Sequence, residues 1–215
     1  MIAQAKTFSG FGFFFECGGR DDMNKKMIRI EMIETLKKMD LIIYNELSQA
    51  IKDRVVATLE FIEAEVIGIT LSRFPEVDTR LIIEAAWERG KKIVVPKCIA
   101  KTRTMDFRLI TSFEDLETVY MDLLEPIVAK TTSIRKEDIS LQIVPGVVFS
   151  DQGYRIGFGG GYYDRYMKYF QGEVLSLAFE MQTGKSVPVE SHDIPVEKII
   201  TEKGIHHCRK VRENK

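Results

Sequence analysis

The sequence predicts an α/β domain in which helices pack on a parallel β-sheet. Residues 65–96 contain a β-branched alternation (EVIGITLS), a helical pattern (TRLIIEAAWERG) and a short apolar run (KKIVVP). Short connections of this kind are typical of a βαβ unit, whose two strands lie parallel. The 215 residues contain no linker, internal repeat or low-complexity segment, so they fit one domain with a substantial core.

Two helices are expected before this unit. The first takes Asn24 as its N-cap and places four apolar side chains on one face: Ile28, Met32, Leu36 and Met39. The second covers residues 44–58. Within the βαβ unit, Gly90 suits the position after the helix, and Pro96 should terminate the following strand.

The middle of the chain is less regular. Residues 105–110 (MDFRLI) predict an outer strand, and residues 112–119 (SFEDLETV) predict a short helix. Residues 123–129 (LLEPIVA) predict a turn around Pro126.

Apolar strands return in the last third. Residues 139–150 and 173–180 have strand-like patterns, and residues 162–170 between them resemble a helix. Residues 197–208 (EKIITEKGIHHC) predict one last strand and a tail.

Charge and cysteine content exclude several classes of function. Lys and Arg number 31 against 32 Asp and Glu, which argues against a nonspecific nucleic-acid binder but leaves room for a local basic pocket. Cys17, Cys98 and Cys208 form no CxxC pair, so neither a disulfide framework nor a zinc site is expected. No apolar run approaches the roughly 20 residues of a membrane span, and a reduced, cytoplasmic setting is expected.

The first 22 residues predict an N-terminal extension, disordered or loosely docked, before a single domain at residues 23–215. Its phenylalanines suggest a signal peptide, but only Lys6 stands in the basic region and glycines interrupt the short apolar run. An extension is therefore the preferred interpretation.

The most informative segment is GYRIGFGGGYYDRY, residues 153–166. Four glycines follow an apolar strand and precede a predicted helix, where backbone N–H groups can turn towards a phosphate. The pattern is neither a Walker loop nor a dinucleotide fingerprint. Arg155, Tyr162, Tyr163 and Asp164 sharpen the signal, because they suit an anion, a heterocycle and the Mg²⁺ of a nucleoside triphosphate. The alternative is a tight turn carrying a polar surface cluster.

Three further features are ambiguous when taken singly. Lys25 and Arg29 lie one helical turn apart and form either a cationic clamp or a solvated basic face. Asp78, in FPEVDT with Glu76, is either a site residue or an N-cap. Asp193, after His192, is either a metal ligand or a turn residue.

Taken together, the segments resemble the 5-formyltetrahydrofolate cyclo-ligase family, also called 5,10-methenyltetrahydrofolate synthetases. The resemblance spans about residues 24–203 and follows the order KKMIR, LSRFPEVDT, GKKIVVP, MDF, LEP, VPGVVFSDQGYRIGFGGGYYDRY and VPVESHDIPVEKIITE. The long glycine segment is its specific element. The extension before Met23 departs from the family pattern.

The resemblance implies a single α/β domain with a mixed, mostly parallel sheet flanked by helices, similar to the NagB/RpiA/CoA-transferase-like architecture. It also implies ATP as cosubstrate, Mg²⁺ and a reduced folate. ATP phosphorylates the 5-formyl oxygen, N10 attacks, and loss of phosphate leaves 5,10-methenyltetrahydrofolate and ADP. Such chemistry requires both substrates to be held in line.

Site residues follow from the resemblance, position by position. It places ATP at Lys25, Lys26, Met27, Ile28, Arg29, Arg155, Ile156, Gly157, Phe158, Gly159, Gly160, Gly161, Tyr162 and Tyr163. Folate is expected at Arg73, Glu76, Asp78 and Tyr162, and Mg²⁺ at Asp164 and Asp193. The expected catalytic residues are Arg155, Tyr163 and Asp164.

Other functions stay open at this stage. A small-molecule kinase or sugar-phosphate isomerase could use a similar fold, and so could a nucleotide-binding module without catalysis. ATP and 5-formyltetrahydrofolate are the expected partners, with neither nucleic acid nor membrane. The chain is expected to be a monomer or weak homodimer.

Overall fold

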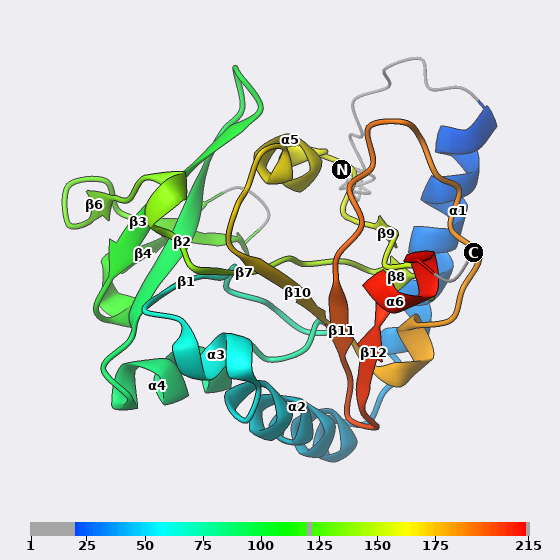
Figure 1. Cartoon of the computed structure of the whole chain (residues 1–215), viewed down its shortest axis with the longest axis horizontal. Helices are drawn as coiled ribbons and strands as arrows, with labels where there is room; N and C mark the ends of the chain where they lie inside the picture. Colours follow the sequence, from blue (N-terminus) through cyan, green and yellow to red (C-terminus); the bar gives the residue numbers. More distant parts are fainter. Residues whose placement is uncertain (1–19, 120–121, 214–215) are drawn as a thin grey trace, which may run out of the picture.

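A computed structural model describes residues 20–119 and 122–213 (Figure 1). Its centre is an eight-stranded sheet. In spatial order the strands are β12 (Ile205–His207), β11 (Lys198–Ile200), β10 (Glu173–Leu177), β7 (Leu141–Ile143), β1 (Val66–Gly68), β2 (Lys92–Ile99), β3 (Thr104–Ile110) and β6 (Thr132–Ser133). The five strands from β11 to β2 run parallel, whereas β12, β3 and β6 pair antiparallel with their neighbours. The predicted mixed, mostly parallel sheet is confirmed.

Helices cover both faces of this sheet. They are α1 (Arg20–Leu36), α2 (Leu41–Val56), α3 (Leu59–Glu63), α4 (Arg80–Glu88), α5 (Tyr162–Met167) and α6 (Cys208–Glu213). Figure 1 shows α2, α3 and α4 together on one side of the central strands and α5 on the other. Short 3₁₀ turns complete the fold: η1 (Phe113–Asp115), η3 (Lys136–Asp138) and η4 (Glu180–Gln182).

The alternation of strand side chains explains the two helical layers. In β2, Ile93 and Val95 join the large cluster formed with α2, α3 and α4, whereas Val94 faces the opposite cluster with Phe107. Ile200 and Ile199 divide between the faces in the same way. Because both faces are covered, the central residues of these strands are consecutive and apolar.

Helix boundaries depend on local caps. Asp40 starts α2, since its side chain accepts hydrogen bonds from the N–H groups of Ile42 and Ile43. The first helix begins at Arg20, so Asn24 lies inside α1 and the prediction that it is the N-cap is wrong. Gly90 follows α4 with φ +71°, as predicted for the position after a helix.

Pro96 does not terminate its strand, because β2 continues to Ile99. Pairing with β1 ends at Val94, so the missing N–H of Pro96 removes no hydrogen bond to β1. Beyond that point β2 pairs only with β3 along a hairpin that projects from the molecule in Figure 1.

Two other regions also differ from the prediction. The expected helix at 112–119 is only η1 followed by β4 (Leu116–Thr118), and the turn around Pro126 is β5 (Leu124–Pro126) paired with β4. The C-terminal region contains β11, β12 and α6 rather than one strand and a tail. The β4–β5 pair forms a separate two-stranded sheet, and β12 pairs with β11 at the edge of the main sheet; such pairings between strands cannot be read from one segment of sequence.

No helix within residues 20–119 and 122–213 is both long and apolar enough to cross a membrane.

The fold brings three distant segments together at one end. As Figure 1 shows, the segment between η4 and β11 runs beside α1, next to the small hairpin of β8 (Val148–Phe149) and β9 (Arg155–Ile156).

Candidate active site

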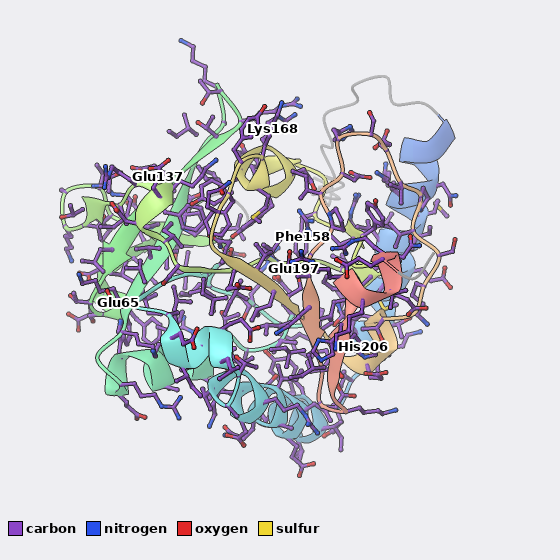
Figure 2. All side chains as sticks on the ribbon, viewed as in Figure 1. Glu65, Glu137, Phe158, Lys168, Glu197 and His206 are labelled. Carbon is purple, nitrogen blue, oxygen red and sulfur yellow. The ribbon has the colours of Figure 1, made fainter. Side chains whose placement is uncertain are left out.

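The glycine segment connects β9 to α5. Gly159 and Gly161 have φ values of +98° and +60°, in the left-handed region that glycine adopts without a steric penalty. The guanidinium of Arg165 donates hydrogen bonds to the carbonyl oxygens of Gly160 and Gly161, at 3.1 and 2.9 Å. Phe158, labelled in Figure 2, is half exposed. The segment is thus an open loop, whose shape depends on its glycines and on hydrogen bonds from the Arg165 side chain.

Helix α1 packs against this loop, as predicted. Arg29 Nε donates to the carbonyl oxygen of Gly157 at 2.6 Å, and Ile28 packs on the cluster that contains buried Ile156. Lys26 is half-buried, whereas Met27 is exposed. The two segments that the sequence assigned to ATP therefore meet in space.

Lys25 makes an unexpected set of contacts. The residue is buried, and its ammonium lies 2.7 Å from Glu190 Oε2 and 2.8 Å from Asp193 Oδ2. Burial alone would lower the pKa of Lys25, but hydrogen bonds to Asp193 and Glu190 outweigh it and the pKa is raised. The lysine is therefore charged, and in this structure its ammonium group forms ion pairs with two carboxylates.

Arg155 and Asp164 form a second ion pair. Arg155 Nη2 lies 3.0 Å from Asp164 Oδ1, and Arg155 Nη1 donates to the carbonyl oxygen of Ile194 at 2.6 Å. The N–H of Ile194 donates to the same Asp164 oxygen at 3.3 Å. Asp164, in the first turn of α5, thus contacts the residue that follows Asp193. The two predicted metal ligands are therefore connected through Ile194.

The carboxylates suit a magnesium ion chemically. Glu190, His192 and Asp193 offer ligand atoms that all lie within 4.8 Å of one another, and carboxylate oxygens are the hard ligands that Mg²⁺ prefers. Asp164 is outside this group. A metal held here by Asp193 would have Glu190 as an additional oxygen ligand, which the sequence interpretation missed.

Tyr163 links the glycine segment to the main sheet. Its hydroxyl lies 2.5 Å from Thr70 Oγ1, just beyond the end of β1, and burial raises the pKa of Tyr163. The tyrosine is accordingly protonated at neutral pH. The neighbouring Tyr162 is half-buried.

A hollow opens beside Thr70, past the ends of β1, β7 and β10. Its walls include Thr70, Ser72, Glu76, Pro145, Gly146 and Gln182. Burial raises the pKa of Glu76 to about 7 despite opposing effects of the Arg73 backbone and charge. This first hollow combines apolar walls with a carboxyl group that can be neutral or charged near physiological pH.

The other predicted folate residues line a second hollow. Arg73 and Asp78 lie there with Tyr44, Phe74 and Arg80 around a volume of about 270 Å³, and Ser72 borders both hollows. Asp78 Oδ1 accepts a hydrogen bond from the N–H of Arg80, the first residue of α4, but the N-cap residue of this helix is Thr79. Arg73 is exposed. Glu76 therefore lines a different hollow from Arg73 and Asp78, although the charge of Arg73 still acts on the Glu76 carboxyl group.

Family comparison defines the class of protein to which this site belongs. A model of the 5-formyltetrahydrofolate cyclo-ligase family matches residues 21–202, and the chain belongs to that family. A mouse 5-formyltetrahydrofolate cyclo-ligase is 27% identical over 189 residues, which cover 83% of this chain and 93% of the relative.

Solved structures agree with this assignment. The NMR structure of 5,10-methenyltetrahydrofolate synthetase from Aquifex aeolicus has a TM-score of 0.75 at 25% identity and covers 86% of this chain and 93% of its own. A 5,10-methenyltetrahydrofolate synthetase from Mycoplasma pneumoniae shares the fold, with a TM-score of 0.68 at 23% identity and coverage of 84% and 99%.

Sequence reasoning missed Thr70 and Glu190. Thr70 is one of many strand-end hydroxyls, and nothing local marks it as the partner of Tyr163. Glu190 stands three residues before Asp193 in VESHD, and this spacing was the available signal.

Proposed function

We propose that this protein converts 5-formyltetrahydrofolate and ATP into 5,10-methenyltetrahydrofolate, ADP and phosphate. The observation that carries the proposal is the Tyr163–Thr70 contact, which joins the glycine segment to the Glu76 hollow. Two substrates bound on either side of this contact would meet at the carboxyl end of the parallel strands, where ligands of open α/β sheets bind.

The nucleotide side is formed by α1, the glycine segment and the start of α5. Backbone N–H groups of the exposed loop would approach the phosphates, while Arg29 and Arg155 offset their charge. Tyr162 and Phe158 offer aromatic surface for the base. Asp164 holds Arg155 in position through their ion pair.

The folate side comprises the second hollow, of about 270 Å³, and the Glu76 hollow, whose volume of about 30 Å³ admits only an edge of the ligand. A carboxyl group there can accept hydrogen bonds from a pterin ring, or donate one when it is protonated. Asp78 and Arg73, in the second hollow, would contact a more distant part of the same folate. Tyr163, fixed by Thr70, stands between the two sides and would orient the formyl group towards the γ-phosphate.

Magnesium would be held by Asp193 and Glu190, and Asp164, which lies outside that group, would supply a further oxygen from the start of α5. When bound, it would neutralise phosphate charge and orient the γ-phosphate for transfer to the formyl oxygen. No covalent protein nucleophile is required, because the formyl oxygen itself accepts the phosphoryl group and later leaves as phosphate. Loss of that phosphate after attack by N10 gives the methenyl product.

The direct test is an absorbance assay for methenyltetrahydrofolate with ATP, Mg²⁺ and 5-formyltetrahydrofolate. We expect product and ADP in equal amounts, with neither when folate or ATP is omitted. Folded protein that forms no product would exclude the proposal. Folate-independent ADP formation would favour another kinase, and ATP binding without turnover would favour a noncatalytic module. The cytoplasmic setting and the monomeric or weakly dimeric state stay predictions from the sequence.

A further inference from the structure

The cluster around Lys25 cannot receive a triphosphate in its present form. One ammonium faces two carboxylates at 2.7 and 2.8 Å, so these three groups carry one net negative charge. The side chains of Lys25 and Asp193 are only 10% and 12% exposed, so water screens this pair poorly, whereas the Glu190 side chain is 40% exposed and better screened. A phosphate that approached Lys25 would meet Glu190 and Asp193 first.

Neither ligand alone resolves this conflict. A triphosphate that took Lys25 would leave two carboxylates without their cation, and a metal ion that took the carboxylates would leave a buried ammonium without an anion. Removing one partner from a buried pair is strongly unfavourable. When both ligands bind together, each charged group exchanges one partner for another and none is left alone.

We propose that Lys25 and Asp193, assisted by Glu190, form an exchangeable ion pair that makes the binding of ATP and Mg²⁺ mutually dependent. This inference rests on the proposed function, and it assigns Glu190 a part in it. In the ligand-free protein the pair closes the 190–194 segment against α1. In the complex, the carboxylates stay in place and bind Mg²⁺, and the Lys25 side chain moves to bind a phosphate.

The geometry allows Lys25 to leave the two carboxylates without disrupting the 190–194 segment. Asp193 Oδ2 also accepts a hydrogen bond from the backbone N–H of Glu190 at 2.9 Å, so the segment keeps its shape when Lys25 leaves. Asp164 holds Ile194 independently of Lys25. The carboxylates can therefore stay in place while the flexible lysine side chain moves.

The test is calorimetric titration with ATP in EDTA and with ATP in excess Mg²⁺, both without folate so that no turnover occurs. Magnesium neutralises ATP in solution, so affinities are compared between variants rather than within one protein. Asp193→Asn keeps the shape of the side chain and removes its charge. We expect metal-free ATP to bind this variant about tenfold more tightly than wild type. The factor by which Mg²⁺ increases the ATP affinity should be at least tenfold smaller in the variant than in wild type, within the usual range of coupling between sites.

A double-mutant cycle shows whether the effect acts through Lys25. In a Lys25→Ala background, Asp193→Asn should change the metal-free ATP affinity less than twofold. Asp151→Asn removes an exposed carboxylate outside the cluster and serves as the matched control, with no expected change. Glu190→Gln should act in the same direction as Asp193→Asn, and melting curves verify that all variants are folded.

Each outcome has a defined meaning. If wild type binds MgATP but Asp193→Asn leaves metal-free affinity unchanged, or raises it equally in the Lys25→Ala background, the exchange pair is wrong and the proposed function stands. If wild type binds no nucleotide under either condition, the proposed function fails and the exchange pair fails with it.

Discussion

Glu76 illustrates how much one residue depends on its surroundings. Its carboxyl group is buried in the first hollow, and burial raises its pKa to about 7 from an ordinary 4.5. The folded protein therefore retains a proton that the unfolded chain loses at lower pH. Stability falls as pH rises from about 4.5 to 7, and the full cost of burying the charge is present above that range.

Glu76→Gln should remove this cost. The amide has nearly the same shape and no charge, so we expect the variant and wild type to be equally stable at pH 4.5. At pH 8 the variant should be more stable by about 3 kcal/mol, from the size of the pKa shift. Urea unfolding of both proteins at several pH values measures the difference. A difference that does not change with pH would contradict the raised pKa.

Asp164 combines a predicted metal contact with the ion pair to Arg155. Asp164→Asn keeps an acceptor for Arg155 and for the N–H of Ile194. We expect it to lower kcat strongly and to raise the Mg²⁺ concentration for half-maximal activity, with little change in Tm. Steady-state kinetics over a range of Mg²⁺ concentrations, together with melting curves, provide the measurement.

Asp164→Ala is the contrasting variant. It leaves the guanidinium of Arg155, with a side chain only 4% exposed, without its anion, and such a loss costs about 3–5 kcal/mol. For a chain of this size the Tm should fall by roughly 6 °C or more. If the magnesium dependence of Asp164→Asn is unaltered, Asp164 does not bind the metal and its role is purely structural.

At the scale of an element, the glycine segment contains positions with different tasks. Gly157 has open space where a side chain would stand and an ordinary φ, whereas Gly159 has φ +98°. Gly157→Ala should therefore leave Tm unchanged, and Gly159→Ala should destabilise the protein by about 1–2 kcal/mol.

ATP affinity should respond to substitution of Gly157 even though stability does not. If phosphates approach the backbone at Gly157, a methyl group there should weaken ATP binding about tenfold or more in a fully stable protein. Calorimetric titration with MgATP tests this expectation. Normal ATP affinity in Gly157→Ala would place the phosphates elsewhere along the loop.

At the scale of the whole molecule, the nucleotide side connects distant parts of the chain. Lys25 and Asp193 are 168 residues apart, and Arg29 and Gly157 are 128 apart. A ligand that binds across α1, the glycine segment and the 190–194 loop stabilises only the folded arrangement. MgATP at about one hundred times its Kd should add about 2.7 kcal/mol.

This stabilisation should raise the Tm by roughly 5–10 °C, as measured by scanning calorimetry. Gly157→Ala at the same MgATP concentration should show a smaller rise, since its affinity is expected to be lower. An equal rise in both proteins would indicate that the nucleotide stabilises the fold from some other place.

Much of this site could be predicted because its motifs are local. The sequence and the family resemblance predict that the glycine segment and the Lys25–Arg29 helical turn contact the nucleotide; the structure brings the two segments together, and the nucleotide contacts themselves stay predictions. The family resemblance grouped Arg73, Glu76 and Asp78, which all lie in LSRFPEVDT, as folate contacts. Their side chains enter two different hollows, which sequence proximity does not reveal.

The sequence by itself determined the features that depend on a few consecutive residues. Short runs of consecutive apolar side chains specify strands buried on both faces, and glycines permit the positive φ angles of the loop before α5. Only the tertiary structure decided that Lys25 pairs with Asp193 and Glu190, that Tyr163 meets Thr70, and that the pKa of Glu76 is near 7. The physical reason is range: backbone conformation follows from neighbouring side chains, whereas ion pairs and pKa values depend on burial and partners that the order of strands in the sheet brings together.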